Sequence, residues 1–176
     1  MKHGNVKKMV YCAVFASIIA VLAQAQIPLP GLVPISLATF GIMMAGLLLG
    51  WKYGALAVAV YILLGAAGAP VFAGLKGGVS VLLGPTGGYI IGYLFCALLA
   101  GLEIPAMQEK FSGRCILLIL GTLACYLLGT AWFIHATGRT AGESLGLCVL
   151  PFLPGDGVKI LLCSFLAPRL RKAIKM

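Results

Sequence analysis

Apolar stretches of membrane-spanning or nearly membrane-spanning length recur along the whole of this 176-residue chain. A helix that crosses a bilayer needs about 20 mostly apolar residues. In this sequence 61% of the residues are hydrophobic and 10% are charged, whereas a soluble domain is about half apolar and about one quarter charged. A water-soluble fold could not hide that much apolar surface. We therefore expect an all-α integral membrane protein in which residues 1–176 form a single transmembrane bundle.

Pro and Gly clusters separate the apolar stretches and mark their connections. About six spans are predicted, at residues 9–25, 35–49, 53–67, 80–102, 115–135 and 145–167. Several of them are shorter than the bilayer requires. We therefore expect short or broken helices around a ligand cavity.

Lys and Arg are distributed unequally between the two sides of this predicted bundle. Counting alternate connections places ten on one side: Lys2, Lys7, Lys8, Lys52, Lys110, Arg114, Arg169, Arg171, Lys172 and Lys175. Only Lys76 and Arg139 fall on the other side. The positive-inside rule then predicts that both termini are cytoplasmic. The net charge of +9 is explained by basic anchors facing anionic lipid, so no nucleic-acid partner is expected.

Asp156 and Lys159 are charged residues inside the last apolar stretch. Lys159 precedes the terminal anchor Arg169 by about 15 Å of helix, which is about half of the hydrocarbon thickness. Each such charge costs about 2.5–3.5 kcal/mol to insert and is tolerated where it meets a partner or a wet cavity. Residues three apart on a helix share a face, so the two side chains can pair. The alternative is that Asp156 only caps the start of a helix after Gly155.

Helix-breaking residues surround this pair. Pro151, Pro154, Gly155 and Gly157 predict irregular backbone, which is tolerated at this depth only inside protein or along a cavity. A half-helix that begins here would direct its N–H groups into the cavity and favour a polar, partly anionic ligand. A second irregular stretch, residues 70–78, leads through residues 84–88 into the fourth span. It either covers a pocket or is an ordinary surface connection.

Catalytic and metal-binding groups are scarce. Only four carboxylates are present, and Glu103, Glu109 and Glu143 fall in connections. The six cysteines are scattered without metal-ligand spacing, so no metal site is expected. We predict that the chain is not an enzyme. The scarcity of catalytic groups disfavours the alternative of a membrane enzyme that acts on lipid or prenyl substrates. A purely structural helix bundle is the other alternative, and it requires the charged pair to be replaceable by apolar residues.

Five segments together resemble the BioY family, the biotin-specific substrate-binding (S) component of energy-coupling factor transporters in bacteria. They are Pro34-Ile35-Ser36-Leu37, Ala45-Gly46-Leu47-Leu48-Leu49-Gly50, Pro70-Val71-Phe72-Ala73-Gly74, Leu83-Gly84-Pro85-Thr86-Gly87-Gly88-Tyr89 and Leu150-Pro151-Phe152-Leu153-Pro154-Gly155-Asp156. The resemblance implies a multi-pass protein of the bacterial cytoplasmic membrane that captures biotin from outside. A self-sufficient secondary carrier for biotin or a related small carboxylate is the alternative.

The resemblance also implies roles for particular residues. Asp156 and Lys159 match the family residues that contact biotin. A further contact comes from the region between the third and fourth helices, where Gly78, Ser80 and Thr86 are the candidates and Lys76 departs from the commoner small or polar residues. Phe72 and Tyr89 would cover the apolar rings.

The partners implied by the resemblance are a transmembrane coupling protein and two ATPase subunits that hydrolyse ATP, so no cofactor is expected in this chain. In that family a small-residue surface on the first helix docks the partner. Ala16 and Ala20 match such a surface.

Overall fold

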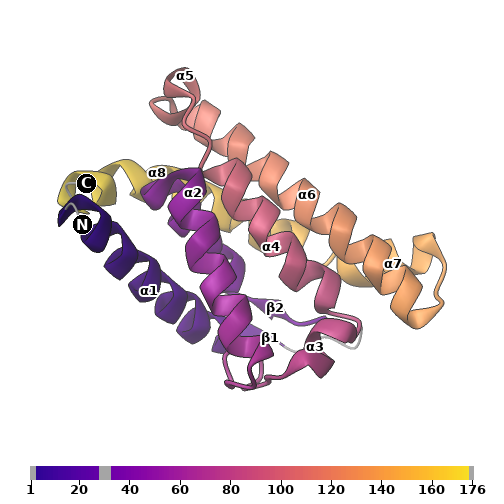
Figure 1. Ribbon diagram of the computed structural model, residues 1–176. Coiled ribbons are helices and arrows are strands. Elements are labelled where there is room, and N and C mark those ends of the chain that lie inside the picture. The colour runs from indigo at the N-terminus through magenta and orange to yellow at the C-terminus, as the bar shows by residue number, and fades with distance from the viewer. Residues whose placement is uncertain (1–2, 28–32, 175–176) are drawn as a thin grey trace.

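The computed structural model describes residues 3–27 and 33–174, which are mostly helical (Figure 1). The helices are α1 (His3–Gln24), α2 (Ala38–Ala66), α3 (Val79–Leu83), α4 (Gly87–Ala100), α5 (Pro105–Gln108), α6 (Phe111–Thr137), α7 (Ala141–Cys148) and α8 (Leu153–Ile174). Two short antiparallel strands, β1 (Gln26–Ile27) and β2 (Ile35–Ser36), lie between α1 and α2. Figure 1 shows α4 between α2 and α6, in agreement with the packing of α4 on both helices.

Helix α2 folds back on itself at Gly50. This residue has φ 78° and ψ 174°, a combination that glycine adopts readily and that interrupts the helix. A Cβ atom at Gly54 would lie 2.8 Å from the Cα atom of Gly46. In a continuous helix, residues eight apart are separated by about 12 Å along the axis. Residues 38–49 and 51–66 are therefore two antiparallel rods, and they correspond to the second and third predicted spans.

By length and composition alone, three of the described helices are long and apolar enough to cross a membrane: Val6–Gln24, Ala38–Ala66 and Phe111–Thr137. The second of these is divided into two shorter rods at Gly50. Helices α7 and α8 meet the same criteria only when taken together, and they are bent by 51° relative to each other. Because α2 contributes two rods and α4 is a shorter apolar rod, six rods result. The prediction of an all-α membrane fold with short and broken helices is confirmed.

The predicted element bounds were wrong at two places. The fourth span, predicted at residues 80–102, consists of α3 and α4 separated at Gly84-Pro85-Thr86. The sixth, predicted at residues 145–167, begins earlier as α7, where Thr140 and Glu143 form a reciprocal capping box. The helix then ends and restarts as α8 at Leu153.

Small residues on α4 and α6 let these helices approach closely. A Cβ atom at Gly88 would lie 2.2 Å from Cβ of Trp132, and one at Gly92 would lie 3.0 Å from Cα of Cys125. Gly88 and Gly92 therefore allow the close packing of α4 on α6. Large apolar side chains point outward instead, and Val21 and Leu127 are 72% and 73% exposed. Such an outer surface suits contact with lipid chains.

Arg114 of α6 lies beside Arg171 and Lys172 of α8 around one hollow. Arg114 was predicted to be a lipid-facing anchor, which is wrong, because it is only 7% exposed. Its guanidinium donates to the backbone carbonyl of Ser164 at 2.9 Å and to that of Gln108 at 2.7 Å. Arg114 therefore ties α6 to α8 and to α5.

Candidate ligand-binding site

Asp156 and Lys159 form an ion pair at the inner end of the site. Nζ of Lys159 lies 2.9 Å from Oδ1 of Asp156, and the two residues are 6% and 4% exposed respectively. Lys159 also donates to the backbone carbonyl of Ser36 at 2.7 Å and to Oγ1 of Thr39 at 2.9 Å. The Tyr126 hydroxyl donates to Oδ2 of Asp156. Buried charges of this kind require such partners.

The start of α8 positions this pair. The backbone N–H of Asp156 donates to the carbonyl of Phe152 at 2.8 Å, so Asp156 already lies within the first turn. The alternative that Asp156 caps a helix beginning after Gly155 is therefore wrong. A carboxylate in the first turn is stabilised by the positive end of the helix dipole. Pro154 is compatible with this first turn because the N–H groups there have no intrahelical acceptor.

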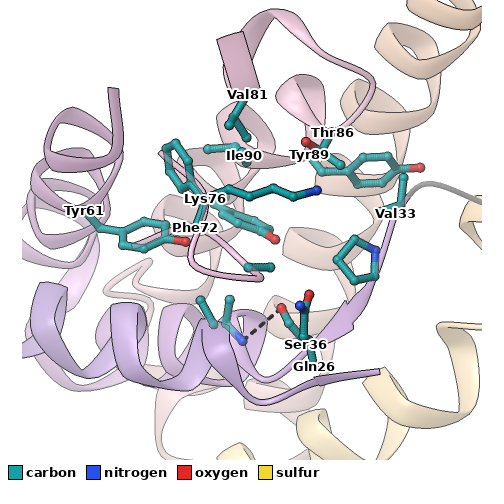
Figure 2. Close-up of a pocket in the computed structure, with 15 residues that line it drawn as sticks. Gln26, Val33, Ser36, Tyr61, Phe72, Lys76, Val81, Thr86, Tyr89 and Ile90 are labelled. Carbon is teal, nitrogen blue, oxygen red and sulfur yellow. Dashed lines mark hydrogen bonds between the residues drawn. The ribbon is translucent and has the colours of Figure 1, made fainter. Parts of the chain in front are cut away.

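A cavity of about 290 Å³ lies beside the charged pair. Figure 2 shows the residues that line this cavity. A smaller hollow of about 30 Å³ contains Asp156, Lys159 and Tyr126 in its wall. Val33, Pro34, Ser36, Tyr89 and Tyr93 line both spaces. The cavity and the charged pair therefore belong to one site.

Two aromatic side chains form apolar walls of the cavity. The ring of Phe72 meets that of Tyr61 edge to face, with centroids 5.6 Å apart. A Cβ atom at Gly65 would lie 2.2 Å from the Phe72 ring, so glycine is needed to seat this ring. Tyr89 is seated similarly over Gly129, and its hydroxyl is 2.9 Å from Oγ1 of Thr130. Such walls suit a largely apolar ligand with a few polar groups.

Gln24 holds the segment that covers the cavity. Its Nε2 donates to the carbonyls of Val71 and Phe72 at 3.1 and 3.2 Å, and its Oε1 accepts from the N–H of Leu75 at 2.9 Å. Leu75 has a positive φ of 55°, which is uncommon outside glycine. The interpretation of residues 70–78 as part of a pocket is therefore supported over that of a simple surface connection.

A family model described as the BioY family matches residues 1–176. This chain belongs to the BioY family. Among the relatives is the probable biotin transporter BioY of Pyrococcus horikoshii, which is 38% identical over 94% of this chain and 96% of its own length. The biotin transporter BioY of Thermotoga maritima is 36% identical over the same shares. A solved structure, the S-component for biotin from an ECF-type ABC transporter, superposes with a TM-score of 0.89 at 35% identity and covers 98% of this chain and 94% of that one.

Several site residues predicted for this BioY chain lie together. Asp156 and Lys159 form the charged pair, and Phe72, Thr86 and Tyr89 line the adjoining cavity. Gly78 and Ser80 do not line either space. Gly78 instead precedes α3 with φ 95° and donates its N–H to the Gly65 carbonyl at 2.7 Å, and Ser80 is an exposed residue of α3.

The predicted docking role of Ala16 needs correction. Ala16 is 2% exposed and belongs to the core, and Ala20 is partly buried against the same core. This face of α1 packs within the chain, chiefly on α2. The exposed small residues of α1 are Ala13 and Ser17. Ala16 therefore offers no surface to a partner helix.

Sequence reasoning missed three groups that hold the charged pair: the Tyr126 hydroxyl, the Thr39 hydroxyl and the Ser36 carbonyl. Tyr126 lies in the middle of α6 and has no charged residue nearby in the sequence. Its position in the sequence therefore gives no indication that it binds Asp156. The Ser36 contact is made by the backbone, which no side-chain pattern can reveal. The sequence pointed to Ser36 only through the segment Pro34-Ile35-Ser36-Leu37, which resembles the BioY family.

Proposed function

We propose that this chain captures biotin from the outer side of the membrane as the S component of an energy-coupling factor transporter, and that it is not an enzyme. The buried Asp156–Lys159 pair beside an aromatic-lined cavity is the observation that carries this proposal. The BioY family membership and the likeness to a solved S-component for biotin support it.

The chemistry of the site suits the two parts of biotin. An ionised carboxylate offers about four lone-pair positions, of which Lys159 and Tyr126 occupy two on Asp156. The remaining positions can accept the two ureido N–H groups. Tyr61, Phe72 and Tyr89 offer apolar surface to the fused rings. We assign ureido recognition to Asp156, with Lys159 holding its carboxylate in place.

The proposal includes partners, orientation and location. The one-sided distribution of basic residues supports cytoplasmic termini. The bacterial cytoplasmic membrane is proposed as the location from the family membership. From the likeness to a solved S-component of an ECF-type transporter, we propose that a transmembrane coupling protein and two ATPase subunits supply ATP hydrolysis and that this chain needs no cofactor. We propose that residues 1–176 act as one bundle and that the Ala13 and Ser17 face of α1 is available for docking.

Calorimetry with purified protein in detergent tests the proposal directly. Biotin is expected to bind, whereas lipoate, which shares the valerate carboxylate but lacks the ureido group, is expected to bind much more weakly. Equal binding of both ligands would contradict ureido recognition. Uptake into liposomes that contain this chain alone would favour the secondary-carrier alternative, and uptake only with the ATPase partners would favour the proposed one.

Replacing Tyr126 with Phe is expected to weaken biotin binding about tenfold or more. The substitution removes the hydroxyl that holds Oδ2 of Asp156 and keeps the ring, and a hydrogen bond to a charged group contributes about 1.5–3 kcal/mol. Tyr53→Phe is the matched control, because Tyr53 lies under the Lys8 ammonium rather than in the site. Unchanged affinity in Tyr126→Phe would show that Asp156 is positioned without it.

Replacing Gln24 with Met is expected to accelerate biotin dissociation about threefold to tenfold. The variant removes the hydrogen bonds that fix residues 71–75 over the cavity, each with a net contribution of about 0.5–1.5 kcal/mol. Stopped-flow release of labelled biotin measures the rate. Gln108→Met is the control, since Gln108 binds the Ala100 and Leu102 carbonyls away from the cavity. Equal rates in both variants would exclude a clamping role for Gln24.

A further inference from the structure

Two lysines border the site, and only one of them has all its donors in use. An ammonium group has three N–H donors. Lys159 directs its donors to Asp156, the Ser36 carbonyl and Thr39, at 2.7 to 2.9 Å. It can therefore bind a ligand carboxylate only by giving up one of these partners. Such an exchange would break a hydrogen bond that already holds the buried lysine, so Lys159 is less suited to that task than a lysine whose donors are free.

Lys76 reaches the cavity from its other side. Its backbone is fixed, because the N–H of Phe72 donates to the Lys76 carbonyl at 2.9 Å and the N–H of Lys76 donates back at 3.3 Å. Figure 2 shows the side chain extended into the pocket from this loop. Its ammonium group makes no hydrogen bond or ion pair with any residue of the described ranges 3–27 and 33–174. The residue remains exposed, so its charge stays hydrated until a ligand arrives.

The charge balance of the cavity wall favours an anion. Lys76 is the one formally charged residue among the 15 described residues that line the cavity. The Asp156–Lys159 pair next to it is neutral as a unit. A cleft with apolar walls and charge of a single sign attracts ligands of the opposite charge. The structure therefore offers hydrogen-bonding groups at the charged pair and a cationic group at Lys76.

We propose that Lys76 binds the ligand's carboxylate, so that the ligand is held at two ends by different residues. This inference rests on the proposed function. Biotin carries its ureido group and its carboxylate at opposite ends, separated by the rings and the valerate chain. With the ureido group at Asp156, the chain runs along the cavity and its carboxylate reaches the 72–76 loop. Lys76 is then a specificity-determining residue that selects the free acid.

Binding of biotin and of biotinamide, in which a neutral carboxamide replaces the carboxylate, tests this assignment. The unmodified protein is expected to bind biotin about tenfold more tightly than biotinamide, since charge-assisted hydrogen bonds are stronger than neutral ones. Lys76→Gln is expected to raise the Kd for biotin about tenfold and to leave that for biotinamide within about twofold. Retained biotinamide binding also shows that the variant is folded. Lys52→Gln, far from the cavity at the α2 fold, is the control and should bind both ligands normally.

Other results would overturn the assignment of the carboxylate to Lys76. If Lys76→Gln leaves biotin affinity unchanged, or weakens both ligands equally, the assignment of the carboxylate to Lys76 is overturned while biotin capture stands. If the unmodified protein binds neither ligand, both the assignment and the proposed function are overturned.

Discussion

Asp156→Asn is expected to lower the affinity for biotin by about a hundredfold or more. The amide keeps the size of the side chain but removes the charge that Lys159 and Tyr126 hold in place. It also leaves the Lys159 ammonium buried without its counterion. The proposed site uses the Asp156 carboxylate to accept the two ureido N–H groups, and each hydrogen bond to a charged group contributes about 1.5–3 kcal/mol. Isothermal titration calorimetry measures the loss.

Two further variants separate recognition from folding. Glu143→Gln removes an exposed carboxylate of α7 and should leave biotin affinity unchanged. The double variant Asp156→Leu with Lys159→Met removes both buried charges, which is often neutral or stabilising. It is expected to stay folded, as judged by thermal unfolding, yet to bind no biotin. If the double variant still binds biotin, the charged pair is structural only, and the recognition proposed for it is wrong.

Gly54→Leu is expected to prevent stable folding, because Gly54 lies against the backbone at the α2 fold. A Cβ atom there would be 2.8 Å from Cα of Gly46 and 3.0 Å from the carbonyl oxygen of Ala45. Neither atom can move without separating the two rods, and overpacking costs about 1–3 kcal/mol or more. We expect the midpoint of thermal unfolding in detergent to fall by about 10 °C or more, or the folded fraction to disappear.

Gly142→Leu provides the matched control for this prediction. A Cβ atom at Gly142 has nothing within 4 Å, so the same substitution should be tolerated there. The comparison also distinguishes two arrangements of α2. In a straight helix over residues 38–66, Gly54 would not meet Gly46, and Gly54→Leu would have no larger effect than the control. Equal unfolding midpoints would therefore contradict the folded-back α2.

Much of the site could be anticipated because charge inside lipid is costly. Asp156 and Lys159 stood out as ionisable residues in an apolar stretch, and their spacing of three predicted the contact that the structure contains. Their remaining partners could not be anticipated. Tyr126 comes from α6 and Thr39 from α2, and helix periodicity says nothing about which residues of separate helices meet.

Helix α1 illustrates a second limit. Its surface is apolar nearly all the way round, so no polar face marks the side that points outward. The resemblance assigned Ala16 and Ala20 to a partner-facing surface, and nothing in the helix pattern opposed this, whereas Ala16 packs inside the bundle. In a soluble helix the polar face would have settled this question.

The sequence by itself determined the membrane class, the approximate positions of the spans, the family and the charged pair. These features follow from local composition and spacing, because lipid penalises each polar group individually. Only the tertiary structure decided that α2 folds back at Gly50, that Tyr126 and Ser36 hold the pair, and that Lys76 extends into the cavity. These features depend on contacts between segments distant in the chain and on the direction of a side chain leaving an irregular loop. Neither is encoded in any single stretch of residues.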